Sequence, residues 1–182
     1  MDQLDSVKFL NDCQHGFRQK RSCVTQLITT LDDFVNCLNN KGQIDAILLD
    51  FSKAFDKVDH EGLLLKLSQL GIPNSLLSWS RSFLLDRTQS VVVEGFASEC
   101  KPVLSGVPQG TVLGPLFFLI YINDISDDIS PNTFIRLFAD DSLLYREIKT
   151  IEDAHILQKD LNTLQKWEVT WKWSFIPRNA NC

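Results

Sequence analysis

Two adjacent aspartates, Asp140 and Asp141, stand in the stretch FADD between two short apolar runs, NTFIRL and SLLY. Neighbouring carboxylates raise the electrostatic cost of ionising one another, so such a pair either faces water at a turn or is held by a cation. Aspartate is common in turns, and a turn alone would explain an isolated pair. The rest of the sequence has to decide between the two interpretations.

A third aspartate, Asp50, ends the apolar run IDAILL, which is short and bounded as expected of a buried strand. If this strand neighbours the two strands that flank Asp140 and Asp141, three carboxylates meet in one place. Such hard oxygen ligands suit Mg²⁺, which prefers one or two carboxylates together with substrate phosphates. Two such ions roughly 3.5–4 Å apart would activate an attacking oxygen and stabilise a leaving one, which is the chemistry of phosphoryl or nucleotidyl transfer.

A glycine-bearing segment, LSGVPQGTVLGP, runs into the start of an apolar helix. Glycine lets a backbone approach a ligand closely, and the free N–H groups of a helix start favour anionic phosphate. The segment lacks the Gly-Lys-Ser/Thr ending of a P-loop, so taken alone it fits a structural turn equally well.

The composition limits the class of protein. The chain has 182 residues with 23 acidic against 18 basic ones, and its net charge of −5 argues against a protein that grips nucleic acid by bulk positive charge. Local basic patches are still compatible with this balance. Five cysteines without a C-x-x-C pair favour reduced thiols and an intracellular location, in cytoplasm or nucleus. The longest apolar run, PLFFLIYI, is far below the roughly 20 residues that cross a bilayer, so we expect no membrane span.

The hydrophobic pattern predicts a mixed order of helices and strands. Apolar residues at helical spacing after the N-cap Ser22 predict an amphipathic helix that ends near residues 39–42: Val24, Leu27, Ile28, Leu31, Phe34, Val35 and Leu38. Further helices are expected over about 59–70, from Pro73 to about 85, over about 111–125, and from a capping box at 150–153. A hairpin turned at Glu94-Gly95 and two strands flanking the aspartate pair complete an α/β or α+β pattern.

Four stretches carry a resemblance to a known family: QHGFRQKRSCVTQL (14–27), LLDFSKAFDKVDH (48–60), SGVPQGTVLGPLFFLIYINDI (105–125) and FADDSLLY (138–145). They resemble, in order, the successive motifs of reverse transcriptases, most closely those of non-LTR retrotransposons and more distantly those of group II introns. The resemblance covers nearly the whole chain. It implies an α+β right-hand polymerase fold with an antiparallel sheet packed against helices. Residues 1 to about 45 would then be part of the fingers and about 46–182 the palm, with the thumb absent.

The resemblance also implies roles for particular residues. Asp50 resembles the first catalytic aspartate, and Asp140 and Asp141 resemble the aspartate pair of the family. The backbone carbonyl of Phe51 would complete the shell around two Mg²⁺ ions, for which Mn²⁺ is a possible substitute. The implied reaction is RNA-directed DNA synthesis, in which a nucleotide passes from a dNTP to a primer 3′-OH.

Four further residues are implied to contact substrate. Phe55 resembles the aromatic gate beneath the incoming sugar, and Gln109 with Gly110 matches the segment near the nascent base pair. Arg18 falls in a basic stretch where nucleic acid or nucleotide contact is expected, although a solvated basic loop is nearly as good an interpretation. The implied partners are an RNA template, a DNA primer and dNTPs, and the chain would belong to a longer polyprotein.

A departure from the family pattern keeps an alternative open. The chain continues after Phe175 as IPRNANC, so the lysine that the family places in a nearby strand is not identifiable. The alternative is a catalytically inactive relic, or a nucleic-acid-binding module that retains the palm fold. The tryptophans of WEVTWKW could stack on bases, but we expect them to anchor a helix behind the palm.

Overall fold

The computed structural model describes residues 9–173 and 175. These residues divide into two compact units, one formed by those up to residue 52 and those from residue 122 onward, and the other by residues 53–121. Helices and antiparallel sheets alternate along the chain, which confirms the predicted α+β class. This division does not follow the predicted boundary between fingers and palm near residue 45, and that boundary stays a prediction.

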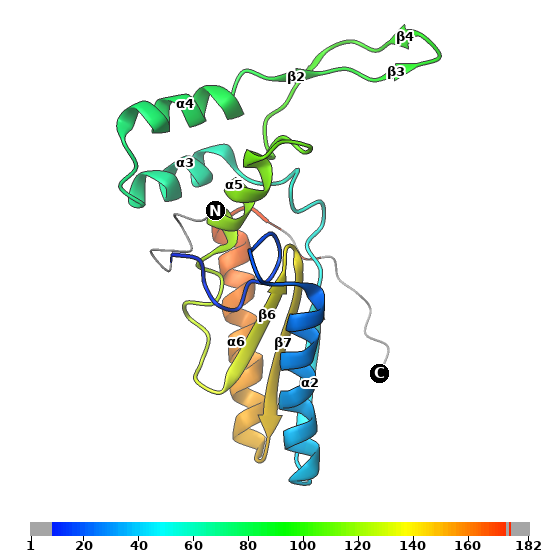
Figure 1. The fold of residues 1–182 in the computed structure, drawn as a ribbon, viewed down its shortest axis with the longest axis vertical. Helices are drawn as coiled ribbons and strands as arrows, with labels where there is room; N and C mark the ends of the chain where they lie inside the picture. The colour runs from blue at the N-terminus through cyan, green and yellow to red at the C-terminus, as the bar shows by residue number, and fades with distance from the viewer. Residues whose placement is uncertain (1–8, 174, 176–182) are drawn as a thin grey trace. The chain divides into compact units, whose positions relative to one another are not determined.

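A three-stranded antiparallel sheet forms the centre of the first unit. Its strands are β1 (Gln43–Leu49), β7 (Asp141–Ile148) and β6 (Thr133–Phe138), in the order β1-β7-β6. Figure 1 labels β6 and β7 side by side. The β6–β7 hairpin closes tightly, because Phe138 pairs with Asp141 and only two residues lie between them. The strands on either side of the aspartate pair and the strand before Asp50 therefore neighbour each other, as the sequence predicts.

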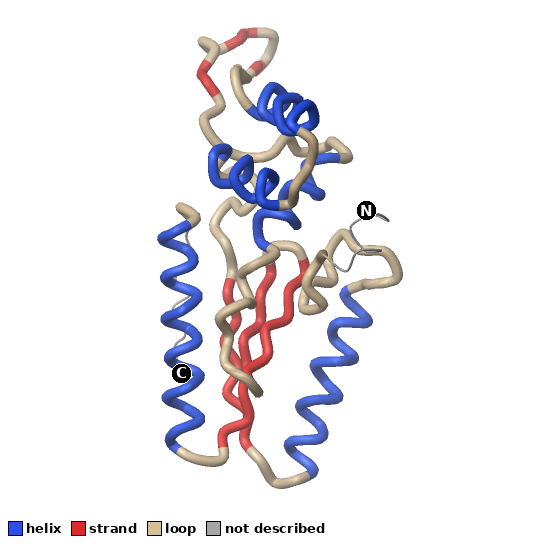
Figure 2. Tube along the Cα trace, turned by 90° about the vertical axis from the view of Figure 1, so that its left-hand side faces the viewer, coloured by secondary structure: helices blue, strands red, loops and turns tan. Residues whose placement is uncertain are grey.

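Two helices cover opposite faces of this sheet. Figure 2 shows the strands between α2 (Cys23–Asn39) and α6 (Ile151–Thr170). Successive side chains of a strand point to opposite faces. Accordingly, Tyr145 of β7 packs edge-on against Phe34 of α2, whereas its neighbour Arg146 pairs with Asp153 of α6 at 2.9 Å.

Helix α2 begins where the sequence predicts but buries an unexpected face. Ser22 is the N-cap and forms a capping box with Thr25. The residues of α2 that are buried are Thr30 and Cys37, while most of its apolar stripe is exposed: Val24, Leu27, Ile28, Leu31, Val35 and Leu38. The helix is amphipathic, yet most of its apolar stripe is exposed and not buried against the sheet of its own unit.

Helix α6 closes the other face of the sheet. Asp153 accepts a hydrogen bond from the backbone N–H of Thr150 at 3.1 Å, which confirms the capping box at its start. Near its end Trp167 packs against Trp173, and buried Trp173 packs against Phe51. These tryptophans anchor the core of the unit, as expected.

The second unit contains three helices: α3 (His60–Gln69), α4 (Asn74–Leu84) and α5 (Leu113–Ile122), whose last residue belongs to the first unit. Asp59 caps α3 by accepting from the backbone N–H of Gly62 at 2.8 Å. Helix α5 is apolar all round and its residues 117–122 are buried, as expected of a helix inside a core. The buried Lys66 ammonium donates to the carbonyl oxygen of Tyr121 at 2.5 Å, a favourable place for a cation at a helix C-terminus.

An exposed two-stranded arm joins α4 to α5. It consists of β2 (Thr88–Gln89) paired with β5 (Lys101–Pro102) and β3 (Val92–Val93) paired with β4 (Phe96–Ala97). Glu94 and Gly95 form its turn, both with positive φ, so the predicted hairpin is confirmed.

Two remaining predictions concern cysteines and membranes. Cys13 and Cys37 are buried free thiols that act as packing residues, whereas Cys23 and Cys100 are exposed, and Cys182 lies outside the described residues. Among the helices of residues 9–173, none combines the length and apolar character needed to span a membrane.

Candidate active site

Three aspartates gather at one end of the three-stranded sheet. The β1–β7 ladder ends with Leu49 opposite Ser142, and one further step of the same register places Asp50 opposite Asp141. Asp140 lies in the two-residue turn immediately before Asp141. Residues about 90 positions apart in the chain are therefore brought to adjacent strand ends.

The electrostatics of Asp140 show that these carboxylates act on one another. Burial raises the pKa of the Asp140 carboxyl, and the negative charges of Asp141 and Asp50 raise it further. The charges of Asp141 and Asp50 thus make ionisation of Asp140 more costly. A cation placed among them would remove that cost, so this donor set fits a divalent metal ion.

The described residues do not form a complete protein cage for such an ion. Across residues 9–173 and 175, no group of three or more His, Cys, Asp or Glu side chains is arranged to hold a metal by itself. Mg²⁺ commonly takes only one or two carboxylates and fills its other positions with water and phosphate oxygens. The aspartates are thus compatible with a site that a nucleotide would complete.

A small cavity adjoins this cluster. It has a volume of about 270 Å³ and is bordered by Asp50 and Asp141, with Leu27 of α2 and Leu48 and Leu143 of the sheet among its walls. The carboxylates therefore stand at the edge of an open, largely apolar space.

Phe51 fixes the chain immediately after Asp50. Its side chain is buried, stacks on Phe175 with ring centroids 4.4 Å apart, and packs against Trp173. Its backbone also forms an antiparallel bridge with Phe175. These contacts hold the end of β1, and with it Asp50, in one orientation.

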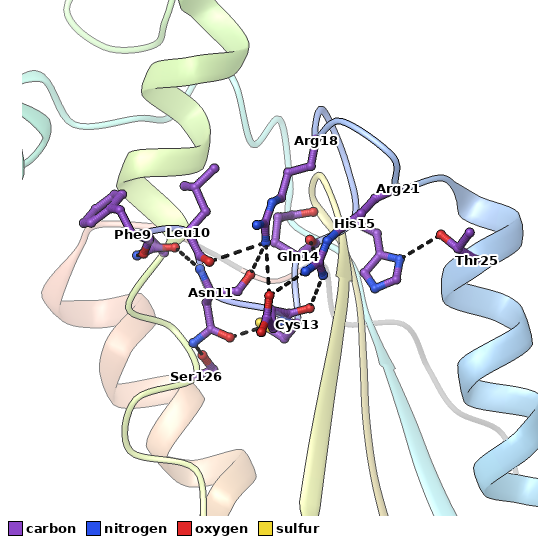
Figure 3. Close-up of polar contacts among 12 residues, drawn as sticks. Phe9, Leu10, Asn11, Cys13, Gln14, His15, Arg18, Arg21, Thr25 and Ser126 are labelled. Atoms are coloured by element: carbon purple, nitrogen blue, oxygen red, sulfur yellow. Dashed lines mark hydrogen bonds and ion pairs between the residues drawn. The ribbon is translucent and has the colours of Figure 1, made fainter. Parts of the chain in front are cut away.

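The basic stretch near the N-terminus is folded back onto its own loop. The guanidinium of Arg18 donates to the backbone carbonyl oxygen of Asn11 at 2.8 Å, and its side chain is only 8% exposed (Figure 3). Arg21 pairs with Asp12 at 2.5 Å. This arrangement favours a loop-stabilising role for Arg18, and its contact with substrate stays a prediction.

The second unit carries the other residues implied to contact substrate. Phe55 is half-buried and stacks on Phe118, with ring centroids 4.2 Å apart and an interplanar angle of 11°. Gln109 is exposed, and its amide donates to Asp56 at 2.8 Å. Gly110 is exposed with φ of +75°, a conformation that favours glycine.

The sequence also gives no sign of a contact that His60 and Arg87 make with the carbonyl oxygen of Gly106. His60 opens α3 and is buried, and its Nε2 lies 2.8 Å from the carbonyl oxygen of Gly106. Arg87 donates to the same oxygen at 2.8 Å. Gly106 has φ of +86°, and a Cβ there would lie 2.7 Å from the carbonyl oxygen of Asp56, so only glycine fits. The pairing joins residues remote in sequence, which no local pattern signals.

Solved structures share this fold. A telomerase from Candida albicans, determined with a fragment of telomeric RNA, superposes with a TM-score of 0.68 over 98% of this chain and 34% of that one, at 14% identity. At this identity the likeness concerns the fold alone. It defines the class as an α+β polymerase fold of the palm-and-fingers type.

Sequence comparisons then give the family. The family described as reverse transcriptase (RNA-dependent DNA polymerase) matches residues 1–177, so the chain belongs to the reverse transcriptase family. It is 33% identical over 174 residues, 92% of the chain, to the RNA-directed DNA polymerase from mobile element jockey of Drosophila melanogaster. It is also 33% identical over 180 residues, 93% of the chain, to the probable RNA-directed DNA polymerase from transposon BS of the same organism. The chain spans 19% of the length of each of these two relatives.

Proposed function

We propose that this chain is part of the RNA-directed DNA polymerase of a non-LTR retroelement and transfers nucleotides from dNTPs to a primer 3′-OH. The observation that carries the proposal is the meeting of Asp50, Asp140 and Asp141 at one end of the sheet, where burial and then the charges of Asp141 and Asp50 raise the pKa of Asp140. Membership of the reverse transcriptase family supports the same chemistry.

The three aspartates would hold the divalent cations, together with the backbone carbonyl of Phe51. When bound, two Mg²⁺ ions, or Mn²⁺ in their place, supply activation of the primer hydroxyl and stabilisation of the leaving pyrophosphate. The protein contributes two anionic strand ends held in fixed register, one by the β6–β7 turn and the other by the packing of Phe51. This preorganisation spares the site the cost of gathering like charges during the reaction.

Substrate recognition is assigned to separate residues. Phe55 would select the sugar of the incoming dNTP, and Gln109 with Gly110 would lie against the nascent base pair. Arg18 would support the RNA template or nucleotide through the loop that it stabilises. In the longer polypeptide, residues 1 to about 45 would contribute to the fingers and the remainder to the palm, and the protein would act in the cytoplasm or nucleus.

The test measures the affinity of the 182-residue chain for Mn²⁺ by electron paramagnetic resonance. Asp140→Asn removes a charge without changing size, so Mn²⁺ affinity should fall by at least the ~10–100-fold that changes around a metal site produce. Asp128→Asn, an exposed acidic residue outside the cluster, is the matched control and should leave affinity unchanged.

The same variants are then compared for primer extension in a longer polypeptide that contains this chain and is as long as its relatives. The wild type and Asp128→Asn should extend an RNA-templated primer, and Asp140→Asn should not. Binding of primer and template without any Mn²⁺-dependent extension by the wild type would favour the inactive relic instead.

A further inference from the structure

The buried side-chain amide of Gln14 forms hydrogen bonds with the turn that carries the aspartate pair. Gln14 is only 3% exposed. Its Nε2 donates to the carbonyl oxygen of Ala139 at 3.1 Å, and its Oε1 accepts from the N–H of Ala139 at 2.9 Å. The same Oε1 accepts from the N–H of Gly16 at 2.7 Å. A single side chain thus satisfies both backbone polar groups of Ala139.

Ala139 has an unusual conformation. Its φ is +55°, in the left-handed region that residues other than glycine seldom occupy, and it directly precedes Asp140. The last pair of the β6–β7 ladder is Phe138 with Asp141, so the ladder does not extend to Ala139. A strained residue persists only where its surroundings fix it. The amide of Gln14 supplies that fixation.

The loop bearing Gln14 is itself attached to the same strand. The N–H of Leu137 donates to the carbonyl oxygen of Cys13 at 2.9 Å, and the N–H of His15 donates to the carbonyl oxygen of Leu137 at 2.8 Å. Gly16 follows so closely that a Cβ there would lie 2.3 Å from the backbone nitrogen of Ala139. The backbone of residues 13–16 and the side chain of Gln14 therefore both contact β6 and the turn that follows it.

The loop is anchored on its other side as well. Two hydrogen bonds fix Asn11. Its N–H donates to the side-chain oxygen of Asn123 at 2.8 Å, and its side-chain amide donates to the hydroxyl of Ser126 at 2.5 Å (Figure 3). Within the same loop, the guanidinium of Arg18 donates to the carbonyl oxygen of Asn11. Gln14 is consequently held by the segment after residue 122 as well as by β6.

We infer that Gln14 is a positioning residue that sets the direction of Asp140 by fixing Ala139. The inference rests on the proposed function, because it matters for catalysis only if Asp140 holds a divalent cation. In this view the stretch QHG acts on the metal site through the backbone of the turn, without touching the metal or the nucleotide. Loss of the amide would free Ala139 and let the Asp140 carboxylate move away from Asp50 and Asp141.

The experiment uses the 182-residue chain with Gln14→Met, which keeps the length of the side chain but removes both hydrogen-bonding groups. Amide exchange measured by NMR should show the Ala139 N–H exchanging at least ~10-fold faster, since its acceptor is lost. Mn²⁺ affinity should fall by about 10–100-fold, as for other residues that orient metal ligands. Gln165→Met, an exposed glutamine on α6, is the matched control and should change neither quantity.

A second variant separates positioning from charge and from general loss of stability. Gln14→Glu keeps an acceptor for the two N–H groups but loses the donor to Ala139 and adds a negative charge near the site. A purely electrostatic influence would raise Mn²⁺ affinity, whereas displacement of the turn lowers it. We expect affinity to fall while exchange of amides in the centre of β7 stays as in the wild type.

The outcomes distinguish this inference from the proposed function. Unchanged Ala139 exchange in Gln14→Met, or unchanged Mn²⁺ affinity despite faster exchange, overturns the role of Gln14. A wild-type chain that binds no Mn²⁺ overturns the proposed function itself.

Discussion

Asp33 of α2 forms an ion pair with Arg136 of β6 at 2.9 Å, and both side chains are half-buried. The carboxylate of Asp33 also accepts a hydrogen bond from the hydroxyl of Tyr145. Burial, followed by the carboxylate of Asp33, raises the pKa of Tyr145 to about 12. A polar network, together with the packing of Phe34 on Tyr145, therefore attaches α2 to the sheet, since most of the apolar residues of this helix are turned outward.

The network makes Asp33 a strong test of how α2 is held. Asp33→Ala leaves the Tyr145 hydroxyl without this acceptor and a half-buried guanidinium without its counter-ion, which should lower the free energy of unfolding by about 1–3 kcal/mol. Urea titration of the 182-residue chain measures this loss. Asp32→Ala, at the exposed neighbouring position, should change it by less than ~0.5 kcal/mol. Equal effects of the two changes would show that the network does not hold the helix.

The ion pair between Arg146 and Asp153 gives the fold a defined pH dependence. Hydrogen bonds from Arg146 and then Thr150 lower the pKa of Asp153 from its ordinary 3.8 to about 2. A carboxylate with a depressed pKa contributes stability that is present above its unfolded value and lost as pH falls through its folded value. The stability difference between wild type and Asp153→Asn should therefore be constant above about pH 4 and shrink between about pH 4 and pH 2. Chemical denaturation across this range measures it, and a difference that persists at pH 2 would contradict the assignment.

Periodicity and capping residues predicted the local structure because these signals lie within one segment. Ser22, Asp59 and Thr150 mark helix starts that the structure confirms, and Glu94-Gly95 marks the hairpin turn. The aspartates at strand ends could also be found, because a carboxylate after an apolar run is conspicuous. Whether the three aspartates lie close together depends on the order of the strands in the sheet, and the sequence alone does not determine that order.

The remaining features depend on contacts between distant segments. Gln14 lies 125 positions from Ala139, and His60 lies 46 positions from Gly106, so no periodic pattern could pair them. The amphipathic pattern of α2 gave its helical character but not its orientation, since polar Asp33 binds the sheet while the apolar stripe is exposed. Periodicity reports that a helix has two faces, and tertiary contacts decide which face is buried.

Phe55 allows a test of sugar selection. A ring at this position would crowd a ribose 2′-OH but tolerate deoxyribose, so discrimination would arise from a clash with the wrong substrate. In a polypeptide that carries this chain at the full length of its relatives, Phe55→Val should raise ribonucleotide incorporation relative to dNTP by roughly 10-fold or more. Phe55→Tyr keeps the ring and serves as the control. Single-nucleotide extension kinetics measure the ratio, and equal discrimination by wild type and Phe55→Val would place the gate at another residue.

The outward orientation of the α2 stripe makes a last prediction that contrasts two apolar residues three positions apart. Leu31 is 58% exposed, whereas Phe34 packs on Tyr145. Leu31→Lys should change the free energy of unfolding by less than ~0.5 kcal/mol, and Phe34→Lys should lower it by about 3 kcal/mol or more, because a cation would replace a ring in contact with the sheet. Leu31→Lys should also reduce concentration-dependent association in sedimentation velocity, since contiguous exposed apolar side chains promote it. A large loss of stability with Leu31→Lys would mean that the stripe is buried in the folded chain, and the orientation of α2 described above would be wrong.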